Sequence, residues 1–376
     1  MTASAPTLKE SLLEGLLSDG CVAAGSCSAE PFAETRVEIE RRKLSGESAD
    51  LTFTFNDPTR STDVQVSLPW ATTLVVGAWS YAESAGSPGG PRPATGRVAR
   101  FATEDHYRGL RRALHRCAAS LRSEGYLAEV LVDDNRLVDR AAAVRAGVGW
   151  WGKNTMILTP KWGPWMLLGS VATDASMPAS SPSRRDCGTC AACLPACPTG
   201  ALVAPGVLDA RTCLAYWLQA PGVIPVDLRK ALGDRIYGCD DCLEACPPGR
   251  RVVDSAVTTS GRHDLLTLWA MSDSALLAEF DHFYVPRRNA NILRRNIVVA
   301  LGNCGDDEAD ELLQSLLSDA DWLLRAHAVW ALAERIGEAC RPDLQRLARV
   351  ETRVEVRTEI ARVVSRAIEP IQGNKL

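Results

Sequence analysis

Eight of the thirteen cysteines lie close together in the middle of the chain, at spacings that suit iron–sulfur chemistry. The first four form a C-x2-C-x2-C-x3-C-P run from Cys187 to Pro198, and a shorter C-x2-C-x3-C-P run extends from Cys239 to Pro247. Cys213 is the unassigned cysteine nearest to the shorter run. In bacterial ferredoxins, three cysteines of such a run hold one [4Fe–4S] cluster and the fourth reaches the other cluster. The pattern therefore predicts two [4Fe–4S] clusters.

The crossover between the two runs predicts which cysteines share a cluster. The first set is Cys187, Cys190, Cys193 and Cys246, and the second set is Cys197, Cys213, Cys239 and Cys242. Zinc is the competing metal because C-x2-C pairs also bind zinc, but zinc sites do not require the x3-C-P step twice. Clusters of this kind transfer one electron at a time, so any substrate chemistry must take place elsewhere in the chain.

The composition constrains the cellular location of the protein and its possible partners. A net charge of −4, from 42 basic and 46 acidic residues, gives a nucleic-acid partner no overall support, so such a partner would need a local basic face. The N-terminus lacks the basic start and apolar run of a signal peptide, and no apolar stretch reaches the roughly 18–20 residues of a membrane span. We therefore predict a cytoplasmic protein without a membrane partner, where clustered cysteines more often hold metal than form disulfides.

The region before the cysteines alternates between predicted strands and helices. Short apolar runs bounded by turn residues predict strands at Thr72–Ala78, Leu127–Val132 and Trp165–Ala172. Helical spacing of apolar residues predicts helices at His106–Arg122 and Leu137–Ala146. Interleaved strands and helices are typical of an α/β or α+β sheet domain.

The region after the cysteines contains an internal repeat. Leu293–Gly302 resembles Leu324–Ala333 at an offset of 31 residues, and Val356–Val364 repeats the pattern more weakly. Helical repeats at this spacing predict a short HEAT-like solenoid, with a plain helical bundle as the alternative. We expect an α+β multidomain chain: an N-terminal α/β domain, a ferredoxin-like domain with two [4Fe–4S] clusters, and HEAT-like repeats. The predicted bounds are 1–178, 179–255 and 262–376, and the Gly- and Pro-rich stretch Ser87–Gly96 is expected to be a loop.

Five segments together resemble the epoxyqueuosine reductase family. They are VDDNRLVDRA at Val132–Ala141, RAGVGWWGKN at Arg145–Asn154, GPWMLLG at Gly163–Gly169, IYGCDDC at Ile236–Cys242 and LPWATTLVV at Leu68–Val76. The detached Cys213 and the HEAT-like repeats also match that family. The resemblance covers nearly the whole chain.

The resemblance implies a specific reaction. Enzymes of this family bind cobalamin in the N-terminal domain, receive electrons through the clusters, and reduce epoxyqueuosine to queuosine at the wobble position of a tRNA. The family's proton-donating aspartate matches Asp133, for which helix capping is the alternative reading from the residues alone. The implied partners are the tRNA anticodon stem-loop and an external low-potential electron donor, and we expect a monomer.

The cobalamin contacts are predicted less directly. A glycine-rich loop around Lys153 would let the backbone approach a flat ligand, and the resemblance places the stretch containing Asp240 near the corrin. Arginines and lysines at such positions are also common on solvated surfaces. The predicted cobalamin-binding residues are Arg60, Arg140, Lys153, Asn154, Gly169 and Asp240.

Two departures from the family pattern fall near the predicted site. The family's Thr or Ser, Gly or Ala, and Pro after the aspartate are replaced by Asp134–Arg136, and its Asp-Tyr-His appears as Asp105–Tyr107 with the last two residues exchanged. These departures leave the exact substrate open. Two alternative functions also stay open: a cobalamin and iron–sulfur enzyme that acts on a small molecule, like a reductive dehalogenase, and a non-enzymatic electron-transfer protein. For tRNA phosphates, the candidate basic spots are the pairs Arg184–Arg185, Arg250–Arg251, Arg287–Arg288 and Arg294–Arg295.

Overall fold

The computed structural model describes residues 6–82, 94–253 and 261–366, and its contacts divide the chain into two compact units. Unit 1 comprises Met1–Ala85, Thr103–Cys213 and Asp240–Thr258, and unit 2 comprises Gly86–Ala102, Leu214–Cys239 and Thr259–Leu376. The predicted mixture of α and β structure is confirmed. The three predicted domains remain a proposal about sequence modules, because the segment between Cys213 and Asp240 makes its contacts with the helical part.

Unit 1 is built on a four-stranded sheet in the order β1-β2-β7-β4, with every pair antiparallel. The strands are β1 (Ala23–Ser28), β2 (Thr73–Ser80), β7 (Met166–Thr173) and β4 (Ala128–Leu131). The two central strands are apolar along most of their length because helices cover both faces. Leu74, Val76 and Ala78 pack with α5 (Asp139–Arg145), whereas the alternate residues of β2 face α4 (His106–Ser123). The predicted strands and both predicted helices are confirmed within about two residues.

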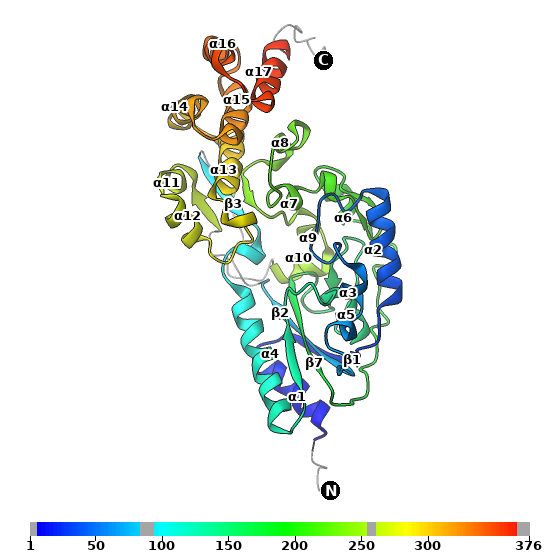
Figure 1. The fold of residues 1–376 in the computed structure, drawn as a ribbon. Coiled ribbons are helices and arrows are strands. Elements are labelled where there is room, and N and C mark those ends of the chain that lie inside the picture. Colours follow the sequence, from blue (N-terminus) through cyan, green and yellow to red (C-terminus); the bar gives the residue numbers. More distant parts are fainter. Residues whose placement is uncertain (1–5, 83–93, 254–260, 367–376) are drawn as a thin grey trace. The chain divides into compact units, whose positions relative to one another are not determined.

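A pair of glycines lets α4 lie close to the sheet. Gly77 of β2 is paired with Gly169 of β7, and the Leu114 side chain of α4 lies over both. A Cβ atom at Gly169 would stand 2.7 Å from Leu114 Cδ1, which is too short for real side chains. Asp105 caps the helix by accepting a hydrogen bond from the Arg108 amide at 3.1 Å. Helix α4 lies beside β2 and β7 (Figure 1).

The part of unit 1 around the clustered cysteines consists of short elements joined by loops. These are β5 (Trp150–Trp151), β6 (Ile157–Leu158), α6 (Cys193–Ala196), β8 (Leu202–Ala204), β9 (Val207–Leu208), α9 (Asp241–Glu244) and α10 (Pro247–Val253). Helix α6 contacts α9, so the two cysteine runs meet. The remaining helices of unit 1 are α1 (Leu8–Ser18), α2 (Ala33–Ser45) and α3 (Pro58–Thr62).

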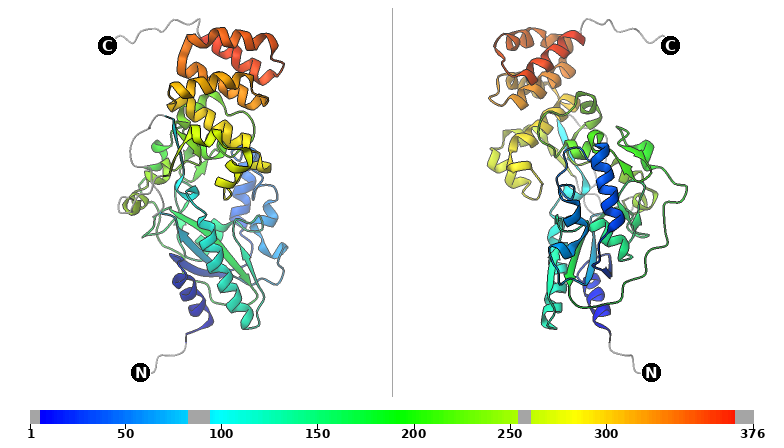
Figure 2. Two further views of the ribbon diagram at one scale, coloured as in Figure 1. Left: turned by 90° about the vertical axis from the view of Figure 1, so that its left-hand side faces the viewer. Right: turned by 45° about the vertical axis from the view of Figure 1, so that its right-hand side comes forward.

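Unit 2 combines a small sheet with stacked helices. Strand β3 (Thr95–Val98) pairs with β10 (Arg235–Tyr237) and β11 (Arg262–Asp264). The helices are α7 (Leu214–Trp217), α8 (Val226–Leu232), α11 (Leu265–Ala270), α12 (Asp273–Glu279), α13 (Ala290–Cys304), α14 (Asp307–Ser315), α15 (Trp322–Ile336), α16 (Arg341–Val350) and α17 (Val354–Arg366). Helices α13, α15 and α17 pack in succession, as the yellow-to-red part of Figure 2 shows, and they carry the three predicted repeats.

One predicted basic spot is wrong because its side chains are structural. Arg295 is fully buried, and its guanidinium donates to the carbonyl oxygens of Trp217, Ala220 and Gly222 at 2.7–2.8 Å. Burial lowers the pKa of Arg295 to about 9. Its neighbour Arg294 is 9% exposed and pairs with Asp273 at 2.9 Å. This pair therefore holds a loop of unit 2 and is not available to phosphates.

Two further expectations have partial outcomes. Most of the predicted loop Ser87–Gly96 lies outside the described residues, and its last two residues belong to β3. Among the described residues, no helix combines the length and the apolar composition that crossing a membrane requires.

Candidate iron–sulfur and acid site

The structure brings the first predicted ligand set together. Cys193 lies at the start of α6, and Cys246 lies between α9, which contacts α6, and α10. Cys246 interacts electrostatically with Cys187, Cys193 and Cys190, the other three cysteines of the set. Burial, followed by these like charges, raises the pKa of Cys246 to about 11, and a bound metal cation would offset the cost of ionising this thiol. The ligand assignment remains a proposal that this proximity supports.

Cys197 of the second set accepts hydrogen bonds from backbone amides. The Ala201 amide donates to Cys197 Sγ at 3.2 Å. Burial alone would raise the pKa of Cys197, but the hydrogen bonds from Thr199, Leu202 and Ala201 outweigh burial and lower it. Amide donors to a ligating sulfur also tune the potential of a bound cluster.

The cysteines of each predicted set are not arranged to bind one common metal ion. In the part of the chain that the structure describes, no three His, Cys, Asp or Glu side chains are arranged to hold a metal ion. The cysteines of a cubane each bind a different iron atom, so they need not converge on one point. None of the cysteines forms a disulfide, and all thirteen are free.

A cluster of acidic and tyrosine side chains, which we call the acid group, lies where α4 begins, β4 ends and α5 begins. Asp133 follows β4, and Asp139 opens α5. Both carboxylates interact electrostatically with Tyr107, from the first turn of α4. Burial, then the charges of Asp133 and Asp139, raises the pKa of Tyr107 well above its usual value, so its phenol keeps its proton at physiological pH. The guanidinium of Arg111 lies 5.2 Å from the centre of the Tyr107 ring.

The Asp133 side chain is accessible to solvent and is also partly enclosed by protein. Its side chain is exposed, yet burial is the largest cause of its raised pKa; Arg111 lowers this pKa and Asp134 raises it. Both descriptions hold if the carboxyl reaches solvent on one side while protein encloses its other sides. Its backbone has φ of +53°, a left-handed conformation that aspartate tolerates at a cost of roughly 1–2 kcal/mol. Asp133 thus has the features of a proton donor: it can be reached, and it retains its proton to a higher pH than usual.

The substituted residues after Asp133 hold its loop through polar contacts. Arg136 Nη2 lies 2.7 Å from Asp134 Oδ2 and 3.2 Å from Glu129 Oε1. The Asn135 side chain accepts a hydrogen bond from the Thr54 amide at 2.9 Å. These contacts anchor the loop that follows Asp133.

The acid group connects to the second cysteine set through Tyr81. Tyr81 is buried at the end of β2, and burial raises its pKa well above the usual value. The further causes include the charges of Asp240 and Cys242, which raise this pKa, and of Arg140, which lowers it. Within unit 1, the acid group and one end of the second ligand run are therefore electrostatic neighbours.

The predicted cobalamin-binding residues do not gather at one point. Arg140 and Asp240 lie with the acid group, and exposed Arg60 interacts with Asp134. Asn154 is buried, and its side chain donates to the Cys242 carbonyl oxygen at 3.4 Å. Lys153 contacts the first cysteine run, as described below.

Gly169 has a packing role that would account for it without a ligand, because it lies under Leu114 in the centre of β7. Its role in cobalamin binding, like those of the other five residues, stays a prediction. Sequence reasoning missed Arg111 and Tyr81 as members of the acid group. The spacing of Tyr107 and Arg111, one helical turn apart after the Asp105 cap, is the pattern that could have indicated Arg111.

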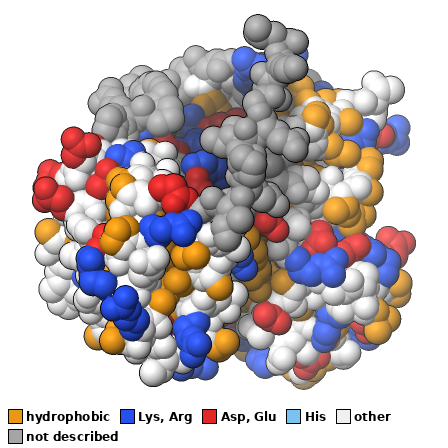
Figure 3. Space-filling model, turned by 90° about the horizontal axis from the view of Figure 1, so that it is seen from above, with side chains coloured by type: hydrophobic (Ala, Val, Ile, Leu, Met, Phe, Trp, Pro, Cys, Tyr) orange, Lys and Arg blue, Asp and Glu red, His pale blue; other side chains and the backbone are white. Residues whose placement is uncertain are grey.

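The three remaining arginine pairs are exposed at Arg184–Arg185, Arg250–Arg251 and Arg287–Arg288. On the face drawn in Figure 3, Lys and Arg side chains lie among Asp and Glu side chains. A tRNA-binding face built from these pairs stays a prediction.

Loss of one first-set cysteine is expected to remove one cluster. We expect Cys246→Ser to halve the iron content of anaerobically reconstituted protein, because the first cluster loses a ligand while the second keeps all of its own. Iron and acid-labile sulfide analysis measures this outcome. Cys340→Ser, at a buried thiol of the helical repeats, is the matched control. An unchanged iron content in Cys246→Ser would contradict the assignment.

Comparison with known proteins agrees with the site. Residues 186–249 match the 4Fe-4S double cluster binding domain, and residues 287–365 match HEAT repeats. The fold and these matches define an iron–sulfur oxidoreductase with two [4Fe–4S] clusters and a HEAT-repeat region.

Relatives extend the likeness to the whole chain. Epoxyqueuosine reductase of Staphylococcus aureus is 30% identical over 89% of this chain and 90% of its own length. The Escherichia coli enzyme of that name is 35% identical over 69% of this chain and 73% of its own length. A crystal structure of epoxyqueuosine reductase with an epoxyqueuosine-modified tRNA-Tyr stem loop superposes with a TM-score of 0.87 at 29% identity, covering 96% of this chain and 98% of that one. The chain belongs to the epoxyqueuosine reductase family.

Proposed function

We propose that this chain reduces epoxyqueuosine to queuosine at the wobble position of tRNA, with cobalamin that is reduced through the two clusters. The conversion of an epoxide to an alkene consumes two electrons and two protons, and its oxygen leaves as water. The clusters deliver the electrons one at a time from an external low-potential donor. The protein must therefore supply a proton at the departing oxygen.

The observation that carries this proposal is the environment of Asp133. Its carboxyl is accessible, its pKa is raised by burial, and it neighbours Tyr107, which remains protonated. A proton donor near neutral pH requires these properties. The same unit holds seven of the eight predicted cluster ligands, so electron entry and proton delivery belong to one compact body.

The residues around Asp139 fit a ligand that carries many amide groups. Asp139 Oδ1 is buried without a hydrogen-bond partner among the described residues, and burial raises the pKa of Asp139 well above its usual value. A protonated Asp139 could donate to, and accept from, the amide side chains of cobalamin. When bound, cobalamin supplies a strongly reducing cobalt centre. Arg140 and Asp240 would contact the corrin periphery, and Asp133 would hold its proton for the substrate oxygen.

The substrate, the location and the assembly follow from the same proposal. The solved relative carries an epoxyqueuosine-modified tRNA stem loop, and we infer the same class of substrate, an anticodon stem-loop, for this chain. Such a tRNA is encountered in the cytoplasm, where we place the protein as a monomer.

Expression in a cell that accumulates the substrate tests the proposal. The host is a bacterial strain whose own epoxyqueuosine reductase gene is deleted, grown with cobalamin, and its bulk tRNA is digested and analysed by mass spectrometry. We expect queuosine to appear with the wild-type chain and not in the absence of cobalamin. Persistent epoxyqueuosine, with both clusters loaded and cobalamin bound, would favour the small-molecule alternative. Failure to bind cobalamin at all would favour the electron-transfer alternative.

A further inference from the structure

Lys153 reaches the loop that carries the first cysteine run. It lies between β5 and β6, and its Nζ donates to the Gly188 carbonyl oxygen at 2.7 Å. Gly188 stands between Cys187 and Cys190 and has φ of +49°, a conformation that favours glycine. The ammonium group is therefore anchored to the backbone that wraps around the first cluster.

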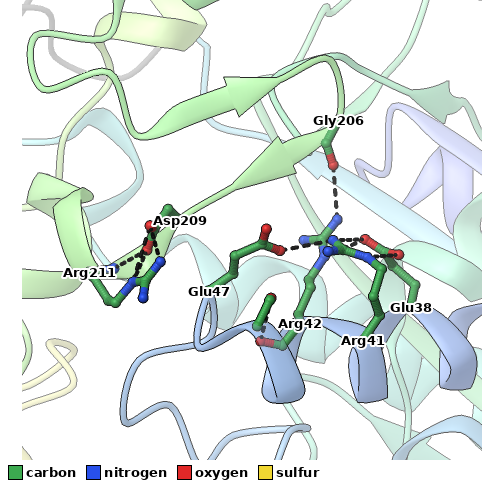
Figure 4. A network of polar contacts seen from close by, with 8 residues as sticks. Glu38, Arg41, Arg42, Glu47, Gly206, Asp209 and Arg211 are labelled. Atoms are coloured by element: carbon green, nitrogen blue, oxygen red, sulfur yellow. Dashed lines mark hydrogen bonds and ion pairs between the residues drawn. The ribbon is translucent and has the colours of Figure 1, made fainter.

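The backbone of Lys153 is held from the other side. Its carbonyl oxygen accepts a hydrogen bond from the Gly206 amide at 2.9 Å, in the turn between β8 and β9. The Gly206 carbonyl oxygen accepts from Arg42 Nη2 at 2.9 Å, and Arg42 is itself paired with Glu38 of α2 at 2.7 Å. Figure 4 shows these groups of α2 pointing toward the Gly206 turn. Lys153 is thus fixed between the hairpin and the cluster loop.

The charge of Lys153 is directed at the cluster ligands. Lys153 forms no ion pair among the residues that the structure describes. It interacts electrostatically with Cys193, a predicted ligand of the first cluster. A positive charge without a neighbouring acid stabilises negative charge on nearby cysteine ligands.

We propose that Lys153 sets the reduction potential of the first [4Fe–4S] cluster. Reduction of a [4Fe–4S]2+ cluster by one electron from a low-potential donor gives [4Fe–4S]1+ and transfers no proton. The cluster and its thiolates gain one negative charge, so a fixed cation nearby stabilises the reduced state and makes reduction easier. This inference rests on the clusters and not on the tRNA substrate, so it can fail or stand independently of the proposed function.

Redox titration of the reconstituted holoprotein, monitored by electron paramagnetic resonance, tests the proposal. Lys153→Gln removes the charge and keeps a donor, Lys153→Met removes both, and Lys153→Arg keeps both. Lys43→Met, at an exposed lysine of α2, is the matched control for loss of one positive charge. We expect Lys153→Gln and Lys153→Met to lower the potential of one of the two reduction steps by about 59 mV. This shift is a tenfold change in the equilibrium constant of a one-electron step. The other step, and both steps in Lys153→Arg and Lys43→Met, should stay near the wild-type potential.

Two outcomes would overturn the proposal. If neither step moves in Lys153→Gln and Lys153→Met, the charge does not act on the cluster. If the step moves in Lys153→Met but not in Lys153→Gln, the hydrogen bond to Gly188 is the cause instead of the charge. Iron content is measured for each variant, and Lys153→Gln and Lys153→Arg keep the comparison decisive if Lys153→Met fails to hold its first cluster.

Discussion

Replacing Asp133 with asparagine is expected to slow epoxyqueuosine reduction by about 10²–10⁴-fold, the usual range for loss of a general acid. Asparagine has nearly the same shape but cannot release a proton to the departing oxygen. Iron content and cobalamin binding should stay at wild-type levels, because Asp133 is not a predicted ligand of either. Single-turnover measurement of queuosine formation gives the rate. Glu124→Gln, at an exposed carboxylate after α4, is the control and should retain the wild-type rate.

The same residue predicts how the rate depends on pH. Burial raises the pKa of Asp133, and the donor is active only while it is protonated. The rate should therefore be highest at low pH and fall as the pH rises through this raised pKa. The fall should be absent from the residual rate of Asp133→Asn. A wild-type rate that increases over the same pH range would contradict the role of Asp133 as the proton donor.

Removal of Glu359 is expected to destabilise unit 2 by about 3–5 kcal/mol. Arg229 pairs with it through two contacts, at 2.8 Å and 3.1 Å, and the two side chains are 0% and 5% exposed. Glu359→Ala leaves the guanidinium buried without its counter-charge, which costs more than the pair itself contributes. Urea unfolding of the full chain, followed by circular dichroism, measures the change.

Two further variants separate this mechanism from a general effect of mutation. Glu338→Ala removes an exposed partner of Arg341 and should cost less than about 1 kcal/mol. Arg229→Met combined with Glu359→Leu removes both charges and should restore most of the lost stability. If Glu359→Ala cost no more than Glu338→Ala, the buried pair would not have the predicted effect.

The sequence predicted the parts of the site that depend on local spacing. Cysteine spacing follows from the size of a cubane, so the two runs around Cys187 and Cys239 could be recognised without a fold. The stripe of apolar residues on α4 and the apolar run of β2 likewise predicted their elements. HEAT repeats could be found because one helix pattern recurs at a fixed offset.

Other features depend on contacts between distant segments, which spacing cannot reveal. The neighbourhood of Asp133 joins α4 to the end of β4, and the packing of α4 on the sheet, which includes Leu114 on Gly77 and Gly169, brings them together. Arg295 was predicted as a phosphate contact, but carbonyl oxygens far away in the chain surround it. The hydrogen bond from Lys153 to Gly188, which supports the role that we propose at the first cluster, is another contact of this kind, and the role of Lys153 in cobalamin binding stays a prediction.

Conversion of epoxyqueuosine by purified components is the decisive experiment. The reaction contains the anaerobically reconstituted protein, cobalamin, a strong chemical reductant and tRNA that bears epoxyqueuosine, and the digested tRNA is analysed by mass spectrometry. We expect queuosine that requires cobalamin and is nearly lost with Asp133→Asn. Intact epoxyqueuosine, despite two loaded clusters and bound cobalamin, would mean that this protein acts on another substrate.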